Sequence, residues 1–541
     1  MRKRLRGAGF SAVAAAAAAV GLAASAPAQP GPPHLLGLRI SNGGTPFAGD
    51  TPWLTTVSPN GDGFRERALI RFALDREATV EIRAVATDEV SRPVRTVWRV
   101  RRRLTPGPHV IVWRPKRTTP VRTYLIRFVV TGANGARRVY GFEPPRRHRV
   151  TGGLVVRVQG VEAGFLARSY PVGGEATVGI TTDARRVKLQ LFSFATVLRP
   201  SVRDLRTGGV AVAPAVQIDW QRRGNATRYV RISHAGAPKS GLYFLRVTAS
   251  DGRVGYAPLI LRPRTLGEHR VAVVLSTNTW QAYNFEDANG DGWGDSWYVG
   301  GANPTVDLRR PYLDFGVPVR FRDWDLSFIS WLNRTGKSVD FLSDDDLERA
   351  RTGDALRRAY DLVVFPGHEE YVTGHVYGVM RRYRDLGGRL MFLSANNLFW
   401  KVKREGQLLR RVALWRTLGR PEASLVGVQW AASNYGPGRA PYVVQETPAA
   451  SWAFAGTGLR SGSSFGRYGI EIDSRARSSP PGTRVLARIP RAIGRHAAEM
   501  TYYEAASGAR VFAAGVVNFA ASINDPAVSR LVENVWVRLA R

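Results

Sequence analysis

The chain has 541 residues, and its 78 Lys and Arg against 43 Asp and Glu give a formal net charge of +35. That length exceeds what one hydrophobic core usually serves, so we expect about three domains. The chain contains no Cys, which excludes disulfides, a lipid-anchoring Cys, thiolate metal sites and a Cys nucleophile.

The positive charge is spread along the chain instead of being gathered in one segment. All but seven of the basic residues are Arg, which a genome-wide preference for Arg codons would explain. A functional alternative is attraction to an anionic polymer of the cell envelope. We expect no nucleic-acid partner, because no compact Lys/Arg block with interleaved aromatic residues occurs.

Residues 1–28 have the pattern of a secretory signal peptide. A basic start, Met1-Arg-Lys-Arg-Leu-Arg6, precedes an Ala-rich apolar stretch over residues 10–26, and Ala26-Pro-Ala28 fits a cleavage site. A retained membrane anchor is the alternative, because the apolar stretch is near the lower length that spans a bilayer. Export without any Cys indicates a secreted, extracytoplasmic bacterial protein.

Residues 29–35 are predicted to be a linker, and residues 36–150 to form a β-sandwich. Apolar and polar residues alternate over 68–74, 78–84 and 123–130, as they do in half-buried strands. The spacing of these segments is typical of a sandwich.

The segment Ser58-Pro-Asn-Gly-Asp62-Gly resembles the opening of small Ig-like domains found in many secreted bacterial proteins and in the flagellar hook-capping protein. Asn60, Asp62 and Glu66 are candidate Ca²⁺ ligands, because carboxylate and carbonyl oxygens suit this ion. The alternative is a tight turn in which Gly supplies a positive φ.

Residues 151–266 are predicted to form a second β domain. Strand patterns occur at 155–158, 176–180, 187–192 and 256–261. No catalytic cluster stands out in either β region, so we expect a structural or binding role for both.

From residue 267 to 541 the pattern changes to alternating strands and helices, which predicts a doubly wound α/β domain. Helices are expected over 324–334, 376–386 and 525–539, each with an apolar face. A strand is expected close to the end of the chain, at 510–519.

Three apolar runs in this α/β region each stop at a group of polar residues. The runs are 271–275, 361–365 and 389–393, and they are typical of buried parallel strands. Ligands bind just past the carboxyl ends of such strands. We therefore expect the residues that follow them to converge on one site: Tyr283, His368, Glu370 and Asn396.

A second acidic segment, residues 287–295, follows Tyr283 directly. Asp287, Asn289, Asp291 and Asp295 have the alternate spacing and the sixth-position Gly of a Ca²⁺ loop. The Glu expected at the twelfth position is replaced by Tyr298, so a solvated Gly-rich turn is an equal alternative.

Several of these segments carry a family resemblance. Residues 268–541 resemble the C-terminal domain of the N,N-dimethylformamidase large (beta) subunit family, and 151–265 resemble the β domain before it. The matching segments are Ser276-Thr-Asn-Thr-Trp-Gln-Ala-Tyr-Asn284, Arg310-Pro-Tyr312, Gly367-His-Glu-Glu-Tyr371 and residues 396–400. The resemblance implies a fold similar to class I glutamine amidotransferases. Glutaminase chemistry is not expected, because no Cys stands near Ser394-Ala395, where the nucleophile would lie.

The resemblance also implies a mononuclear iron held by two Tyr and one Glu. Carried over to this chain, these ligands are Tyr283, Tyr312 and Glu370, assisted by His368 and Asn396. Phenolate and carboxylate are hard oxygen donors that suit Fe³⁺, and three protein ligands leave positions open for water and a substrate carbonyl. An alternative is a zinc site formed by His368, Glu370 and His375.

The sequence thus predicts a secreted, metal-dependent hydrolase that acts on the carbon–nitrogen bond of a linear amide. Its substrate is a small molecule that the sequence does not identify, and we do not expect dimethylformamide itself. A homo-oligomer is compatible with the sequence, as is a small partner subunit. The alternative function is a non-catalytic surface protein that binds the cell envelope and has a degenerate α/β domain.

Overall fold

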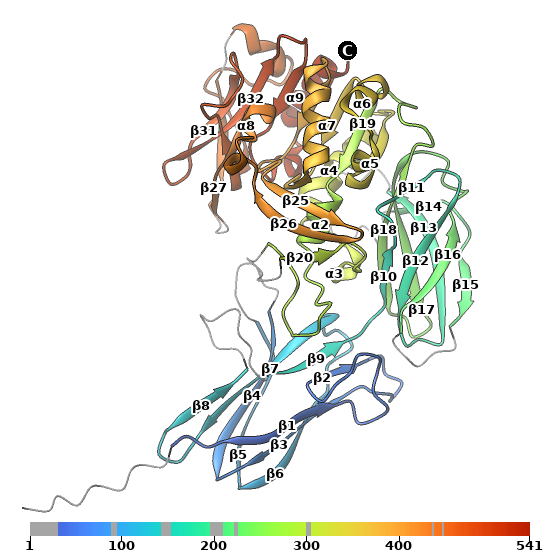
Figure 1. The fold of residues 1–541 in the computed structure, drawn as a ribbon, viewed down its shortest axis with the longest axis vertical. Coiled ribbons are helices and arrows are strands. Elements are labelled where there is room, and N and C mark those ends of the chain that lie inside the picture. Colours follow the sequence, from blue (N-terminus) through green and yellow to red (C-terminus); the bar gives the residue numbers. More distant parts are fainter. Residues whose placement is uncertain are drawn as a thin grey trace, which may run out of the picture.

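The computed structural model describes residues 31–87, 95–141, 153–194, 209–220, 226–298, 304–434, 438–445 and 448–541. The signal peptide expected over residues 1–28 lies outside this part of the chain. Figure 1 shows three units: a blue β unit at the bottom, a second β unit at the right, and an α/β unit at the top. Within the described ranges, no helix is long and apolar enough to cross a membrane.

The first unit consists of two sheets that pack on a common core. Its strand orders are β1-β3-β6 and β2-β9-β7-β4-β5, with β8 paired to β7. Buried side chains such as Ile70, Phe72, Ile82 and Phe128 come from both sheets and form one cluster. The strands are β1 (Leu35–Ser41), β2 (Leu54–Val57), β3 (Ala68–Leu74), β4 (Ala78–Ala86), β5 (Arg95–Leu104), β6 (Gly107–Trp113), β7 (Arg122–Thr131), β8 (Arg137–Tyr140) and β9 (Leu154–Val158).

The boundary expected after residue 150 is too early. Strand β9 falls within the range expected for the second β domain, but it pairs with β2 in parallel and with β7 antiparallel. Its side chains Leu154, Val156 and Val158 complete the core of the first unit. The first unit therefore extends to the end of β9.

The second unit is also built from two sheets, with strand orders β10-β12-β16 and β11-β18-β17-β13-β14, and β15 pairs with β13. Val178 and Ile180 of one sheet and Leu189 and Leu245 of the other share a buried core. The strands are β10 (Glu162–Phe165), β11 (Ser169–Pro171), β12 (Glu175–Thr181), β13 (Arg186–Phe194), β14 (Gly209–Ala211), β15 (Val216–Asp219), β16 (Arg228–Ser233), β17 (Gly241–Ala249) and β18 (Val254–Arg262).

The third unit is organised around a nine-stranded sheet with the order β21-β19-β22-β24-β33-β32-β31-β28-β29. The strands β21, β19, β22, β24 and β33 run parallel, and the rest are antiparallel. The strands are β19 (Val271–Leu275), β21 (Asp340–Ser343), β22 (Leu362–Phe365), β24 (Arg389–Phe392), β28 (Ala440–Val444), β29 (Ser464–Tyr468), β31 (Arg484–Ile493), β32 (His496–Glu504) and β33 (Arg510–Ala513). If the five parallel strands are numbered by their order in the chain, their order across the sheet is 2-1-3-4-5. This order is found in doubly wound sheets.

Helices cover both faces of this sheet (Figure 1). In β19 the alternate residues Val271, Val273 and Leu275 pack on the face that carries α4 and α9, while Ala272 and Val274 pack on the opposite face. The strand is therefore apolar throughout, as the sequence predicted. The helices are α4 (Ser327–Arg334) and α9 (Pro526–Ala540) on one face, and α5 (Asp344–Arg349), α6 (Gly353–Ala359) and α7 (Gly374–Asp385) on the other.

Shorter elements surround the carboxyl ends of the parallel strands. They are α2 (Thr277–Ala282), β20 (Thr305–Asp307), α3 (Leu313–Gly316), the π-helical turn η1 (Arg322–Leu326), β23 (Tyr371–Thr373), β25 (Trp400–Glu405), β26 (Leu408–Leu414), η2 (Trp415–Leu418), α8 (Ala423–Val426), β27 (Gln429–Asn434), η3 (Pro448–Phe454), β30 (Ile470–Ser474) and η4 (Phe519–Ser522). The helix expected over 324–334 is thus η1 followed by α4. A multidomain fold with a β-rich N-terminal part is confirmed, and the likeness to glutamine amidotransferases stays a prediction.

Candidate functional site

The candidate site lies where the order of the parallel strands changes direction. β19 is flanked by β21 and β22, so the connections from β19 and from β22 leave on opposite sides of the sheet. Such a switch point opens a crevice at the carboxyl ends of the strands. The chain places Tyr283 after β19, His368 and Glu370 after β22, and Asn396 after β24.

Three of these side chains touch each other. The Tyr283 hydroxyl donates to the Glu370 carboxylate and lies 3.1 Å from His368 Nε2. His368 Nε2 lies 3.3 Å from Glu370 Oε2, and all three residues are buried. The Nδ1–H of His368 donates to the carbonyl oxygen of Ala395 at 2.8 Å, which turns Nε2 toward the other two side chains.

Asn396 joins this group through a carboxylate that the sequence did not suggest. Its backbone adopts a left-handed φ of 54°, and its N–H donates to both oxygens of Asp473 at 2.8 and 3.0 Å. Its side-chain Nδ2 donates to Glu471 Oε2 at 2.7 Å, and that oxygen lies 3.9 Å from His368 Nε2. In the described part of the chain, Asn396 Oδ1 has no hydrogen-bond partner.

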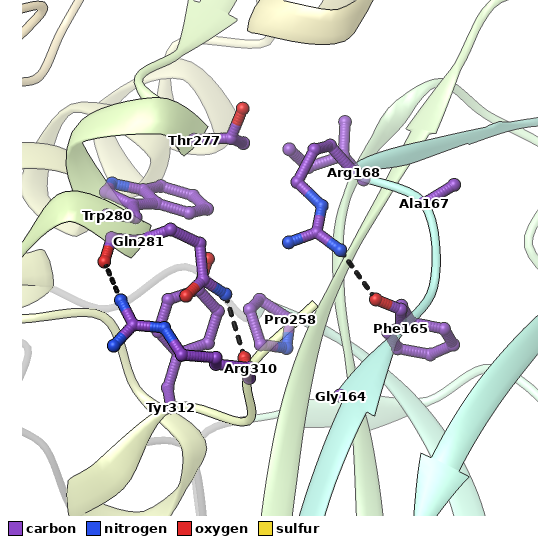
Figure 2. A pocket seen from close by; sticks show the side chains of 11 residues that line it. Gly164, Phe165, Ala167, Arg168, Pro258, Thr277, Trp280, Gln281, Arg310 and Tyr312 are labelled. Atoms are coloured by element: carbon purple, nitrogen blue, oxygen red, sulfur yellow. Dashed lines mark hydrogen bonds between the residues drawn. The ribbon is translucent and has the colours of Figure 1, made fainter. Parts of the chain in front are cut away.

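The structure places a different tyrosine from the expected one beside Glu370. The ring of Tyr371 lies 6.0 Å from that of Tyr283 at an interplanar angle of 82°, and its hydroxyl hydrogen-bonds with Glu370. Tyr312 instead packs edge-on against Trp280, with ring centroids 6.5 Å apart. Figure 2 shows it lining a separate pocket with Arg168 and Trp280, between the second and third units.

Burial and charge shape the protonation of the site. Burial and the adjacent Glu370 carboxylate raise the pKa of both Tyr283 and Tyr371 above the usual value for tyrosine. Burial lowers the pKa of His368, but the hydrogen bond to Glu370 and the negative charge of Glu471 outweigh it, so the pKa rises to about 9. The imidazole is therefore a cation at neutral pH.

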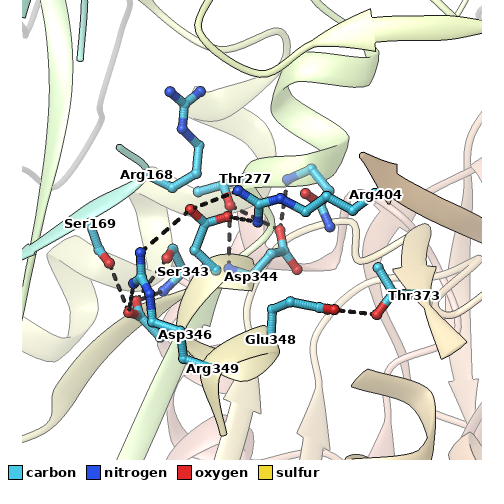
Figure 3. A network of polar contacts seen from close by, with 12 residues as sticks. Arg168, Ser169, Thr277, Ser343, Asp344, Asp346, Glu348, Arg349, Thr373 and Arg404 are labelled. Atoms are coloured by element: carbon cyan, nitrogen blue, oxygen red, sulfur yellow. Dashed lines mark hydrogen bonds and ion pairs between the residues drawn. The ribbon is translucent and has the colours of Figure 1, made fainter. Parts of the chain in front are cut away.

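Helix α2, which carries Tyr283 at its end, is held to the loop after β22. The backbone N–H of Glu370 donates to Thr279 Oγ1 at 3.1 Å, and Asn278 Nδ2 donates to the Tyr371 carbonyl at 3.1 Å. Asp344 accepts from the N–H of Asn278 at 2.6 Å, in the polar network of Figure 3. These contacts fix Tyr283 relative to His368 and Glu370.

The same network reaches the second β unit. Ser343 and Asp346 form a capping box at the start of α5, and Ser169 of β11 donates to Asp346 Oδ1 at 2.8 Å (Figure 3). Arg349 donates to the same oxygen at 2.9 Å. The second unit is thus joined to the elements that support the site.

The expected zinc set is not brought together. His375 lies on α7, where its Nε2 is 2.8 Å from the carbonyl oxygen of Ala350. Within the ranges that the structure describes, no group of three His, Cys, Asp or Glu side chains has a geometry that would hold a metal ion. The set of Tyr283, Tyr371 and Glu370 is of another kind, because it combines one carboxylate with two phenols.

The acidic loop at 287–295 directs its carboxylates to its own backbone. Asp287 accepts from the N–H groups of Gly290 at 2.8 Å and Gly292 at 2.8 Å, and Asp291 accepts from Trp293 at 2.8 Å. Two further side chains do the same: Asn289 accepts from Asp291 at 2.9 Å and Asp295 from Ala288 at 3.0 Å. This is the geometry of the turn alternative, and Ca²⁺ binding stays a prediction.

The segment with Asn60, Asp62 and Glu66 has the same character. Asn60 Oδ1 accepts from the N–H of Asp62 at 3.0 Å, and Asp62 Oδ1 accepts from Phe64 at 2.8 Å. Glu66 accepts from Gly61, whose φ of 90° suits glycine. The side chains here close a turn.

Glu471, Asp473 and Tyr371 are the site residues that the sequence analysis missed. Glu471 and Asp473 alternate with apolar residues in Ile470-Glu-Ile-Asp-Ser474, and both are buried. Acids at alternate positions of a short apolar strand were a usable signal, because buried carboxylates need a partner or a function.

The fold and the site define an α/β protein with a buried Tyr–His–Glu group at the switch point of its sheet. The chain belongs to the family described as N,N-dimethylformamidase beta subunit-like, C-terminal, whose profile matches residues 215–530. The match covers the end of the second unit and nearly all of the third.

Two curated relatives are similar to this chain. The N,N-dimethylformamidase beta subunit of Paracoccus aminophilus is 24% identical over 404 residues, which cover 56% of this chain and 53% of the relative. The protein of the same description from Alcaligenes sp. is 25% identical over 301 residues, which cover 44% of this chain and 39% of the relative. The chain thus spans about half the length of the curated relatives it matches.

Solved structures give only weak similarity. Native Escherichia coli alpha-2-macroglobulin has a TM-score of 0.23 at 11% identity, over 43% of this chain and 16% of that one. The mmIFT52 N-terminal domain has a TM-score of 0.25 at 12% identity, over 38% of this chain and 86% of that domain. These scores are too low to support an argument about fold or function.

Proposed function

We propose that this chain is a metal-dependent amidohydrolase that cleaves the carbon–nitrogen bond of a small linear amide. The observation that carries the proposal is the contact of Tyr283, His368 and Glu370 at the switch point. Its support is membership of a family whose relatives are named N,N-dimethylformamidase beta subunits. The substrate itself is not assigned.

The donor set fits an iron ion. Two buried phenols, Tyr283 and Tyr371, both contact the Glu370 carboxylate, which gives hard oxygen donors and no thiolate. Burial disfavours the phenolates, and a bound cation would offset this cost. When bound, Fe³⁺ would activate the amide carbonyl and a water molecule as a Lewis acid.

His368 is suited to handle the proton. Its Nδ1–H is held by the Ala395 carbonyl, and its Nε2 faces Tyr283 and Glu370. With the pKa raised to about 9, the ring carries a proton at Nε2 that it can donate to a developing oxyanion or to the leaving nitrogen.

Asn396 is suited to orient the substrate. Its Nδ2 is engaged by Glu471 at 2.7 Å, whereas Oδ1 is buried and has no hydrogen-bond partner among the described residues. An acceptor fixed in this way can receive an N–H of an amide substrate. Its left-handed backbone and its bonds to Asp473 keep the side chain in place.

We further propose that the protein is exported and works in an oligomer. Export rests on the signal-peptide pattern of residues 1–28. Oligomerisation rests on the names of the relatives, which describe them as subunits. We also propose that the protein attracts an anionic polymer of the cell envelope, and this proposal rests on its net positive charge alone.

The test combines metal analysis with an assay. The purified protein is expected to bind iron, to show a visible tyrosinate-to-iron absorption band, and to release amine from a panel of linear amides that includes N-substituted formamides. Tyr283→Phe and Glu370→Ala should lose band and activity while remaining folded. A folded wild type that refuses added Fe³⁺ and cleaves no amide of the panel would favour the non-catalytic surface protein instead.

A further inference from the structure

A cleft of about 390 Å³ lies where the three units meet. Gln159 lines it from the end of the first unit, Glu162 and Tyr229 line it from the second, and Glu286 lines it from the third. The cleft is separate from the candidate site, because neither His368 nor any other member of the contacting group lines it. Its size is in the range of small-molecule sites.

Two side chains in this cleft carry polar atoms with nothing to bind. Gln159 is only 2% exposed, and neither its Oε1 nor its Nε2 has a hydrogen-bond partner in the described residues. In the same part of the chain, Glu286 Oε2 is buried without a partner. Folded proteins nearly always pair buried polar atoms, so such a pair of exceptions needs a reason. A bound ligand that supplies both hydrogen-bond donors and acceptors would be such a reason.

The lining of the cleft holds four arginines (Arg122, Arg157, Arg309 and Arg310) and four acids (Glu162, Glu286, Asp287 and Asp307). Several of its arginines are already committed: Arg309 pairs with Asp307 at 2.6 Å, and Arg310 donates to the backbone carbonyls of Glu286 and Asp295 at 3.0 and 3.2 Å. Arg157 donates to the Asp287 carbonyl.

Two of the four carboxylates in the cleft, Glu286 and Glu162, are not committed in the same way. Glu286 keeps an unpaired oxygen, and the charge of Glu162 lies close enough to act on it. Burial raises the pKa of Glu286 to about 8 and the repulsion by Glu162 adds to it, although the charge of Arg310 acts in the opposite direction. This carboxyl is therefore largely protonated at neutral pH, and a positive group bound between the two acids would favour their charged forms.

We propose that this cleft binds a small organic cation through an ammonium group, which Glu286 and Glu162 hold by charge and Gln159 by hydrogen bonds. Three N–H donors of an ammonium group match the free oxygens of Glu286 and Gln159. Tyr229, 59% exposed, offers an aromatic face at the cleft for the cation or its carbon chain. The proposal is independent of the amidase chemistry.

The experiment uses the full chain and three four-carbon probes that differ in charge. Saturation-transfer NMR and thermal melts are recorded with n-butylammonium chloride, n-butanol and sodium butyrate at equal ionic strength. Saturable binding and a rise in Tm are expected for n-butylammonium alone. Binding of butyrate in its place would indicate an anion site, and equal responses to all three probes, or to none, would overturn the proposal.

Variants then locate the binding. Glu286→Gln and Gln159→Met keep the size of each side chain and are expected to weaken n-butylammonium binding at least tenfold. Glu405→Gln, which removes an exposed carboxylate elsewhere, should bind as the wild type does. If Glu286→Gln fails to fold by circular dichroism, Glu162→Gln replaces it. Unchanged affinity in folded cleft variants contradicts the assignment.

Discussion

Two acidic groups lie almost next to each other in this chain and differ in how their polar atoms are used. The site around Glu370 gathers side chains from the ends of separate strands, and these side chains bind each other. The loop at 287–295 begins four residues after Tyr283, yet its carboxylates accept from their own backbone. The sequence led us to expect a metal in both, through the family resemblance at Glu370 and through the spacing of acidic residues in the loop.

The difference lies in what a ligand would have to displace. In the loop, a cation competes with backbone N–H groups that hold the turn together, so binding would cost local structure. In the site, the backbone is supported by other residues such as Thr279 and Asp344. The side chains of Tyr283 and Glu370 can therefore exchange partners without unfolding a turn.

The largest effect is expected from Glu370→Gln, which removes the carboxylate that Tyr283, His368 and Tyr371 contact. Activity and iron content should fall at least about 100-fold, because even supporting residues of metal sites contribute about 10–100-fold. The matched change in the loop, Asp291→Asn, should leave both unchanged. Iron analysis and an amide-cleavage assay on the two variants decide this, and equal losses would erase the distinction between the two groups.

The next effect separates the two tyrosines. Tyr371→Phe should lower iron affinity at least about tenfold and shift the tyrosinate absorption band, because its hydroxyl contacts Glu370. Tyr312→Phe should leave the band in place, since Tyr312 lies in the pocket behind Trp280. The measurement is an iron titration followed by visible absorption. A band lost only in Tyr312→Phe would restore the ligand set implied by the sequence.

A smaller effect is expected from the loop itself. Asp287→Ala removes the acceptor of the N–H groups of Gly290 and Gly292, which should reduce the free energy of unfolding by about 1–3 kcal/mol. Urea denaturation measures this loss. EGTA should leave the Tm of the wild type unchanged if the loop is a turn, whereas a clear fall in Tm on chelation would show that it holds Ca²⁺.

The smallest effect concerns pH and Asp325, a buried acid of η1 that accepts from Trp280 Nε1 at 3.3 Å. Burial raises the pKa of Asp325 from 3.8 to about 7, so its stabilising protonated form is fully present below about pH 4 and is lost as the pH rises through 7. Asp325→Asn should therefore stabilise the protein at pH 8 by more than about 1 kcal/mol relative to its effect at pH 5. Urea denaturation at both pH values tests the sign, and an equal effect at the two would contradict the buried charge.

Local patterns predicted much of the fold. The runs at β19, β22 and β24 were found because strands buried on both faces are apolar throughout. The helix expected over 525–539 is α9, whose start is marked by Asp525 as N-cap and Pro526 at its first turn. The boundary between the first and second units could not be predicted in this way, because β9 pairs with β2, which lies about a hundred residues earlier.

The site was predicted where its residues adjoin a strand end and missed where they do not. Tyr283 follows β19 after the single short helix α2, and His368, Glu370 and Asn396 come within a few residues of the ends of β22 and β24. Glu471 lies on β30, outside the large sheet, and only the packing of β30 against the loop of Asn396 brings it near. That Tyr371 and not Tyr312 contacts Glu370 likewise depends on where each ring lies in the fold, which the local sequence does not show.

The position of β33 has a consequence for how the protein folds as it is made. β33 is the strand that joins the parallel half of the sheet to the antiparallel half, and it comes near the end of the chain. Just after this strand, the carbonyl oxygen of Gly515 accepts from the N–H of Asp473, and Val516 forms a β-bridge with Ile472. While synthesis proceeds, the two β units can fold early, but the site must wait until β33 and the residues that follow it have been made. A nascent chain would thus expose the apolar strands of the large sheet until then.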